Sequence, residues 1–209
     1  MIPPVRAGKY ILLCGLAAAV LGLAAFTVMA VKDQTYVPSD VYAPAGEPVR
    51  EAAVVYYSRS GHSEAVAREI ARMFNAPIAR ITADYALSFS GQRKAISDAN
   101  AEELPEIEVE PLDLHPVRRL FLVSPTWMFR PATPLWAYVE QTDLTGKDVV
   151  LVMTGNSRFE QSEIDAFVKR IEAHGGRLTN HLFLRRGRLY WQKSREDLLG
   201  DVRREVGKL

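Results

Sequence analysis

Cysteine is almost absent from the sequence, and this excludes several kinds of site. Cys14 is the only cysteine among 209 residues. One thiol cannot form an intrachain disulfide or a cysteine-rich metal site. Cys14 also lies far upstream of every candidate loop, which excludes a phosphatase loop with a cysteine nucleophile. The sequence holds no His, Cys, Asp and Glu cluster with metal-ligand spacing and no recognisable Ser-His-Asp set, so we predict neither a metal nor a catalytic side chain.

An excess of charge of either sign is also missing. The chain has 26 Lys and Arg against 25 Asp and Glu, a formal net charge of +1 at pH 7. This balance gives no electrostatic argument for a nucleic-acid partner, and we predict none. Two common nucleotide motifs are missing as well, Gly-x-x-x-x-Gly-Lys-Ser/Thr and Gly-x-Gly-x-x-Gly, which argues against a triphosphate loop and a dinucleotide pyrophosphate site.

A long hydrophobic run is present near the N-terminus. Tyr10–Val31 contains 22 residues without a charge, between Lys9 and Lys32. At about 1.5 Å per residue, such a helix can cross a hydrocarbon layer of about 30 Å. A cleaved secretory signal is the alternative, with Val28–Ala30 as the cleavage site. We favour an uncleaved transmembrane anchor because the run exceeds the usual apolar core of a signal peptide, about 7–15 residues.

The charges around this run predict its orientation. Residues 1–9 form a basic flank with Arg6 and Lys9, whereas Lys32 after the run is offset by Asp33. The positive-inside rule then places the N-terminus in the cytoplasm and the rest of the chain on the other side of a bacterial-type inner membrane, as a single-pass protein. Residues 32–50 contain three prolines and no apolar periodicity, which predicts an extended tether. Residues 51–209 would form the folded domain.

The domain begins with a strand, a tight loop and a helix. Ala53–Tyr57 is an apolar run typical of a buried strand, and Glu64–Asn75 has apolar residues at helical spacing. The loop between them offers the hydroxyls of Ser58, Ser60 and Ser63 and one glycine. With the free N–H groups of a helix N-terminus, these predict a cradle for a terminal monophosphate. The alternative is that Ser60 or Ser63 only caps the helix.

The remaining pattern alternates strands and helices. Further strands are predicted at Pro77–Thr82, Val117–Ser124, Asp148–Met153 and Leu178–Leu184. Helices are predicted at Gln92–Glu103, as a solvated crossover or a flap over a ligand, at Gln161–His174, with Ser157 and Glu160 as its capping box, and at Ser194–Val206. Five strands alternating with helices predict an α/β fold with a doubly wound parallel sheet, in which ligands bind beyond the carboxyl ends of the strands.

Two further loops follow strands at that edge. Trp127, Met128 and Phe129 would leave large apolar area in water unless a planar heteroaromatic stacks on the indole. The alternative is that they pack against the next helix. Residues 154–157, Thr-Gly-Asn-Ser, are small and polar and suit the edge of a heterocycle, although Ser157 could also cap the next helix.

Together these loops resemble the flavodoxin-like superfamily. The similarity covers residues 52–184 and includes Tyr-Tyr-Ser-Arg-Ser-Gly-His-Ser at 56–63, Ser-Pro-Thr-Trp at 124–127, Pro-Ala-Thr-Pro-Leu-Trp at 131–136, Asp-Leu-Thr-Gly-Lys at 143–147 and Thr-Gly-Asn-Ser at 154–157. The resemblance implies a five-stranded sheet in the order 2-1-3-4-5 that binds FMN. The implied cofactor-binding residues are Ser58, Arg59, Ser60, Gly61, His62 and Ser63 around the phosphate, and Pro125, Thr126, Trp127, Met128, Thr154, Gly155, Asn156 and Ser157 around the isoalloxazine.

The resemblance leads to a functional hypothesis, a membrane-tethered FMN flavoprotein that passes electrons to a redox partner protein or a small acceptor. One alternative is an NAD(P)H-dependent quinone or small-acceptor reductase, with Arg130 or the Arg185–Arg188 cluster on the nicotinamide nucleotide. Another is a flavin-free tethered binding module. If Arg130 approaches the flavin's pyrimidine edge, it would raise the redox potential; the alternative is a surface arginine. A wider basic cluster surrounds Tyr190 and Trp191 and would contact anionic lipid, contact a nucleotide or form a solvated face; its members are Arg185, Arg186, Arg188, Lys193 and Arg195.

Overall fold

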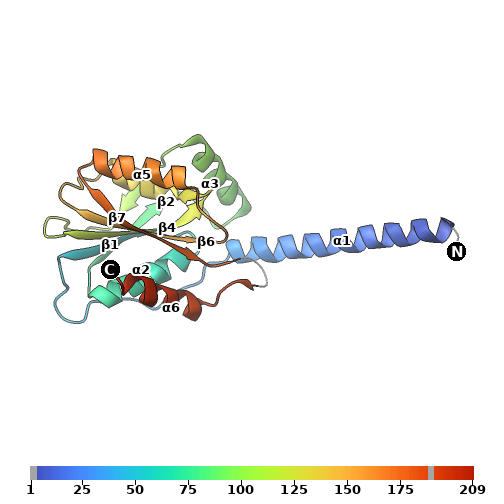
Figure 1. Cartoon of the computed structure of the whole chain (residues 1–209), viewed down its shortest axis with the longest axis horizontal. Coiled ribbons are helices and arrows are strands. Elements are labelled where there is room, and N and C mark those ends of the chain that lie inside the picture. Colours follow the sequence, from blue (N-terminus) through green and yellow to red (C-terminus); the bar gives the residue numbers. More distant parts are fainter. Residues whose placement is uncertain (1–3, 188–190) are drawn as a thin grey trace.

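The apolar run near the N-terminus forms one long helix, α1 (Pro4–Asp33), which projects from the rest of the chain in the computed structural model (Figure 1). The structure describes residues 4–187 and 191–209. Within Gly8–Lys32, the most apolar stretch is not buried against any other part of the described chain. Its length and composition are those of a membrane span and of a signal sequence alike.

The central sheet is built from the predicted apolar runs. Five parallel strands pair in the order β2-β1-β4-β6-β7. They are β1 (Ala52–Tyr57), β2 (Ile78–Ala83), β4 (Arg119–Trp127), β6 (Asp148–Gly155) and β7 (Arg177–Arg185). In chain order this is 2-1-3-4-5, so the predicted doubly wound topology is confirmed. The three central strands, β1, β4 and β6, contain continuous apolar runs, as is typical of strands whose two faces are both buried.

Seven strands, not five, are found among the described residues. The additional two are β3 (Ile107–Val109), which pairs antiparallel with the edge strand β2, and β5 (Arg130–Pro131), which pairs antiparallel with β4. The sequence did not predict them because they are very short and have no apolar run of their own. They leave the parallel order unchanged.

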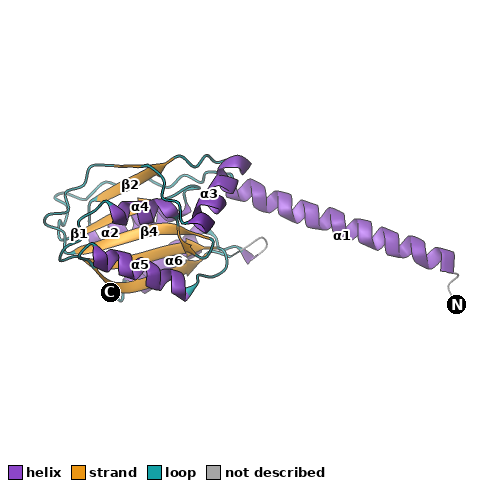
Figure 2. Ribbon diagram, turned by 90° about the horizontal axis from the view of Figure 1, so that it is seen from above, coloured by secondary structure: helices purple, strands orange, loops and turns teal. Residues whose placement is uncertain are grey.

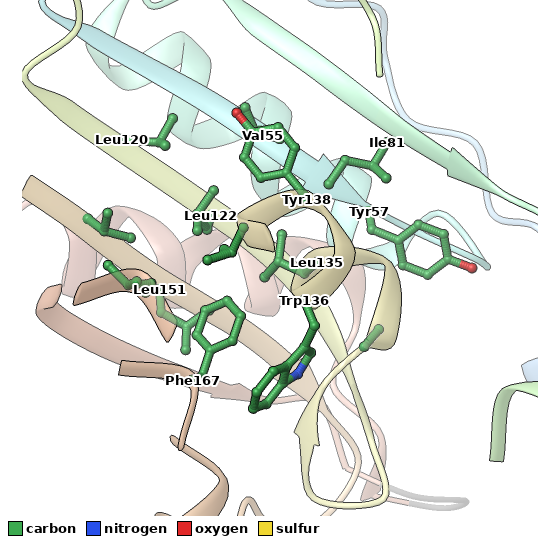
Figure 3. Packing of buried hydrophobic residues seen from close by; sticks show 14 of the residues in the cluster. Val55, Tyr57, Ile81, Leu120, Leu122, Leu135, Trp136, Tyr138, Leu151 and Phe167 are labelled. Atoms are coloured by element: carbon green, nitrogen blue, oxygen red, sulfur yellow. The ribbon is translucent and has the colours of Figure 1, made fainter. Parts of the chain in front are cut away.

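Helices cover both faces of the sheet (Figures 1 and 2). One face carries α2 (His62–Phe74) and α6 (Arg195–Val206), and the other carries α3 (Phe89–Ala101), α4 (Thr133–Glu140) and α5 (Gln161–Ala173). Successive residues of a strand point to opposite faces, so Leu120 and Leu122 pack with α4 and α5 while Phe121 packs with α2 and α6. Figure 3 shows Leu122 close to Leu135 and Leu151 on the first of these faces.

Two predicted helix starts are corrected. Helix α5 has Glu160 as its N-cap without a side-chain cap, so the capping box of Ser157 and Glu160 is wrong. The Glu160 N–H instead donates to the carbonyl oxygen of Phe129 at 2.9 Å, which ties this loop to the β4–β5 hairpin. Helix α2 begins at His62, with Gly61 as N-cap and no side-chain cap, so the alternative of a serine cap is also wrong.

The segment between α1 and the sheet lies along α2. Residues 34–50, all described, contain no helix or strand. Hydrogen bonds fasten it at the start, middle and end of α2: Val37 N–H to the Ser60 carbonyl at 3.0 Å, Arg68 Nη1 to the Ser39 carbonyl at 2.8 Å, and Asn75 Nδ2 to the Glu47 carbonyl at 3.0 Å. The predicted tether is therefore extended but docked on the domain.

Candidate functional site

The three loops meet at the carboxyl edge of the sheet. They follow β1, β4 and β6, and the strand order reverses between β1 and β4, where open parallel sheets form a crevice. A pocket of about 280 Å³ lies at this position. Twelve predicted site residues line it: Ser58, Arg59, Ser60, His62, Ser63, Pro125, Thr126, Trp127, Met128, Thr154, Gly155 and Asn156.

Two predicted residues do not line the pocket, and four lining residues were not predicted. Gly61 and Ser157 are the two outside it. The four additional residues are Gln92, Ala95 and Ile96 of α3, and Arg186 after β7. Their spacing of three and four residues puts the α3 residues on one helix face, which agrees with the alternative of a flap over a ligand. Arg186 belongs to the predicted basic cluster, but nothing local in the sequence separates it from its neighbours.

The loop after β1 is shaped by Gly61, which has a φ of +87°. Its N–H donates to Ser58 Oγ at 3.1 Å, closing a tight turn before α2. A Cβ on Gly61 would overlap the carbonyl oxygen of Val37 and lie 3.0 Å from its carbonyl carbon. Glycine is therefore needed both for its backbone conformation and for the close approach of the docked segment. The turn leaves the N-terminal N–H groups of α2 at the pocket, where the helix dipole favours an anion.

Side-chain hydroxyls join the three loops to one another. Ser63 Oγ and Thr154 Oγ1 are 2.8 Å apart and buried, which links the first loop to the third. Thr126 Oγ1 donates to the Thr154 carbonyl oxygen at 3.0 Å, which links the second loop to the third. The pocket walls are thus cross-linked through Thr154, so their spacing is set before any ligand enters.

Two arginines border the pocket. Arg59 Nη2 donates to the carbonyl oxygens of Ala86 at 2.8 Å and Ser88 at 2.9 Å, which connects the first loop to the start of α3. Arg186 is buried, and its Nε and Nη2 donate to Asn156 Oδ1 at 3.1 and 3.0 Å. The neutral amide of Asn156 orients the Arg186 guanidinium without neutralising its positive charge. The pocket therefore suits a ligand with an anionic group.

His62 adds no positive charge to the pocket at neutral pH. Burial lowers its pKa to about 3, and the charges of Arg186 and Arg195 act in the same direction. A neutral imidazole at the first turn of α2 can donate or accept a hydrogen bond without competing with the guanidinium.

The His62 pKa predicts an acid-sensitive domain. Between pH 6.5 and about 3 the unfolded chain binds a proton at this residue that the folded chain does not. The free energy of unfolding should thus fall by up to about 1.4 kcal/mol per pH unit as the pH decreases through this window. Urea unfolding at several pH values should show a shallower fall for His62→Gln. His181 is half-buried and its pKa is also lowered by desolvation, so His181→Gln serves as the comparison. Equal pH dependence of His62→Gln and the unmodified chain would contradict the prediction.

The second loop carries an aromatic wall. Edge-to-face contacts hold the Trp127 indole against Tyr57, with ring centroids 5.4 Å apart, and against Tyr85 at 4.8 Å. Met128 and Phe129 form the two-residue turn between β4 and β5, and both have positive φ, 44° and 70°. This conformation costs residues other than glycine about 1–2 kcal/mol each. The strained turn presents Met128, which is 40% exposed, at the pocket edge.

Arg130 does not line the pocket, which corrects its predicted approach to a flavin. The side chain is buried, with Nη2 2.7 Å from Glu163 and 3.0 Å from Glu102. Its guanidinium also lies 5.7 Å from the Trp136 ring centroid. Two carboxylates and an indole draw the guanidinium toward α3, α4 and α5, away from the other pocket loops.

The predicted basic cluster is divided among several tasks. Arg185 lies over the Trp191 ring at 4.6 Å, Lys193 pairs with Asp201, and Arg195 Nη2 donates to the Val37 carbonyl oxygen at 2.8 Å. Arg188 and Tyr190 lie outside the described residues. The described members thus contact the docked segment, α6 and the pocket, and they do not form one uniform basic face.

Comparisons of the whole chain place this site in a known fold. No protein-family model and no curated protein matches the sequence. Among solved structures, a flavoprotein from Lactobacillus acidophilus NCFM in complex with FMN is similar, with a TM-score of 0.57 and 17% identity over 65% of this chain and 93% of that one. Its apo-form gives a TM-score of 0.53 at 17% identity, over 73% and 99% of the two chains.

A protein from Bacteroides uniformis ATCC 8492 assigned to the flavoproteins is similar as well. The TM-score is 0.58 at 16% identity, and the match covers 74% of this chain and 98% of that one. These neighbours and the strand order identify the fold as flavodoxin-like, an α/β fold with a mostly parallel central sheet and one additional N-terminal apolar helix.

Proposed function

We propose that the pocket binds FMN and that the protein is a flavoprotein that transfers electrons through the bound flavin while α1 tethers it to a membrane. The observation that carries this proposal is the composition of the pocket. Hydroxyls, a helix N-terminus and a buried arginine gather near the loop after β1, and the Trp127 and Met128 side chains line the wall after β4. An anion site beside an apolar platform suits a phosphorylated planar heterocycle.

The third loop also offers backbone groups to a ligand. A Cβ on Gly155 would lie 2.7 Å from the Phe183 ring and 2.8 Å from Thr126 Oγ1, so this position has room only for glycine. Its neighbours Thr154 and Asn156 line the pocket with polar groups. The N–H and C=O groups here would bind the edge of the isoalloxazine, and the loop after β1 would hold the phosphate. The flavin supplies the redox chemistry, and the protein supplies its position and potential.

The absorption spectrum of the purified full chain in detergent tests this proposal. We expect flavin absorption at a stoichiometry near one and release of FMN, not FAD or riboflavin, on denaturation. The phosphate cradle predicts this preference, because riboflavin has no phosphate and FAD has no terminal monophosphate. A colourless chain that fails to bind added FMN would reject the flavoprotein and favour the flavin-free binding module.

Anaerobic addition of NADH or NADPH separates a carrier from an NAD(P)H-dependent quinone or small-acceptor reductase. A reductase accepts hydride directly, so the flavin absorption would bleach without a partner protein. A carrier would stay oxidised until its redox partner is added.

The side of the membrane on which the domain lies is a separate proposal. If the domain is extracytoplasmic, as predicted, a topology reporter fused to Leu209 should be active only outside the cytoplasm.

The two buried arginines near the site give a matched comparison. Arg186 lines the pocket, whereas Arg130 is paired with Glu102 and Glu163 outside it. Arg186→Met should lower the midpoint potential of bound FMN by tens of millivolts, because a nearby cation stabilises the reduced anion. Arg130→Met should leave the potential unchanged and reduce the free energy of unfolding by about 1 kcal/mol, since it removes the ion pairs of a largely buried guanidinium with the half-buried Glu163 and the exposed Glu102. Redox titration and urea unfolding measure the two effects. Equal midpoint potentials in both variants would show that Arg186 does not lie close to the bound flavin.

A further inference from the structure

Helix α1 leaves the domain on the side where β7 ends and α6 begins (Figures 1 and 2). The residues that line the pocket follow the carboxyl ends of the strands at this same edge. Val37 lies only four residues beyond Asp33, the last residue of α1, and its N–H donates to Ser60 of the first pocket loop at 3.0 Å. Four residues span at most about 14 Å. The end of the apolar helix and the pocket therefore lie close together.

The loop between β7 and α6 lies at the end of α1. Lys32 marks the end of the uncharged run, and its Nζ donates to Gln192 Oε1 at 3.1 Å. If α1 crosses a membrane, the first charge after the apolar run lies at the headgroup level. Gln192 and its neighbour Trp191 would lie at that level too.

Trp191 is exposed and held in place. Its side chain is 43% exposed, and the Arg185 guanidinium lies 4.6 Å from the ring centroid. A Cβ on Gly187, where φ is +90°, would lie 2.5 Å from the indole, so the ring packs directly on the glycine backbone. An ordered indole beside an arginine is a typical arrangement at the interface between membrane and water.

Exposed apolar side chains also surround the pocket. Ile96 and Met128 line it and are 41% and 40% exposed. Phe89, at the start of α3, is 57% exposed and follows Ser88, whose carbonyl oxygen accepts from Arg59 of the first loop. Such side chains normally find a partner surface when they gather beside a site.

We propose that the surface formed by Trp191, Arg185, Phe89, Ile96 and Met128 rests on the anionic surface of the bilayer that holds α1, so that the pocket opens toward the lipid headgroups. This inference rests on the tether of the proposed function and does not require bound flavin. The positive charge of Arg185 and the indole of Trp191 fit anionic headgroups, and the position of the end of α1 sets the distance of this surface from the bilayer. The pocket would then be shielded from large soluble proteins and open to small molecules from the bilayer, of which lipid-soluble quinones are a redox-active class.

Quenching of tryptophan fluorescence by brominated lipid tests this surface. The full chain is reconstituted into vesicles of phosphatidylcholine and phosphatidylglycerol with bromine on the acyl chains near the headgroup, and unbrominated vesicles provide the reference. We expect quenching, and we expect Trp191→Phe to remove more than about half of it, because interfacial indoles lie at this depth. Trp136→Phe is the matched control, since Trp136 is buried between α4 and α5 and should contribute little. Arg185→Glu should weaken quenching only when phosphatidylglycerol is present.

Each outcome decides the inference separately from the flavin proposal. If Trp191→Phe leaves the quenching unchanged, the proposed contact between Trp191 and the membrane is wrong. The same result is expected if a second copy of the chain or a soluble protein covers this surface. A chain that does not float with vesicles would overturn the membrane contact too. Flavin absorption of the same sample reports on FMN independently. A colourless chain with strong Trp191 quenching would keep the membrane surface and reject the flavoprotein.

Discussion

Replacing Gly61 with alanine should nearly abolish FMN binding and destabilise the domain. The positive φ of +87° costs an alanine about 1–2 kcal/mol, and the new Cβ would overlap the Val37 carbonyl group. The obstacle is backbone and not a flexible side chain, so either the docked segment or the phosphate loop must move. We expect a loss of about 2–4 kcal/mol in the free energy of unfolding and about a 100-fold weaker affinity for FMN.

Gly146→Ala is the matched control for this variant. Gly146 has a similar positive φ of +71°, but its Cβ would meet nothing within 4 Å. The control therefore contains the backbone strain without the clash, and it should cost about 1–2 kcal/mol with unchanged FMN affinity. Urea unfolding and fluorescence titration with FMN measure both quantities. Equal stability losses in the two variants would mean that the segment around Val37 can move aside without a measurable cost in free energy. Normal FMN affinity of Gly61→Ala would contradict the phosphate cradle.

Trp127→Ala should have the second largest effect, because one side chain serves both the pocket and the aromatic cluster. Removing the indole eliminates its contacts with Tyr57 and Tyr85, each pair contributing about 0.5–1.5 kcal/mol beyond the buried area. We expect a total destabilisation of about 3 kcal/mol. Loss of a stacking platform should also weaken FMN binding by about 10- to 100-fold.

Two substitutions separate these effects. Trp127→Phe keeps an aromatic platform and should retain most of the affinity, while Trp191→Ala removes an indole outside the pocket and should leave FMN affinity unchanged. Fluorescence titration of folded protein at low temperature measures binding without unfolding. Wild-type affinity in Trp127→Ala would show that the indole supports the loop but does not contact the flavin.

The strand-and-loop framework was predictable because its signals are local. Apolar runs at β1, β4 and β6 predict strands buried on both faces, and the loops that follow them necessarily meet at one edge of a parallel sheet. Twelve of the fourteen predicted site residues consequently line one pocket. Ser157 was the exception at the third loop. Three residues further along, the Glu160 N–H bonds to Phe129 of the β4–β5 hairpin, a contact between segments distant in sequence that no local pattern predicts.

The contacts between distant segments were decided by the tertiary structure. Nothing near Arg186 indicates that its guanidinium bonds to Asn156 in the pocket, and nothing near Arg130 indicates that Glu102 and Glu163 hold it outside. Long polar side chains reach any partner that the fold brings near, so their direction does not follow from local pattern. The sequence by itself determined the strands and the three-loop edge through its runs of apolar residues, and the strand order came from the resemblance of its loops to the flavodoxin-like superfamily. Only the folded chain decided which charges enter the pocket and that residues 34–50 dock along α2, because both depend on hydrogen bonds between segments that folding brings together.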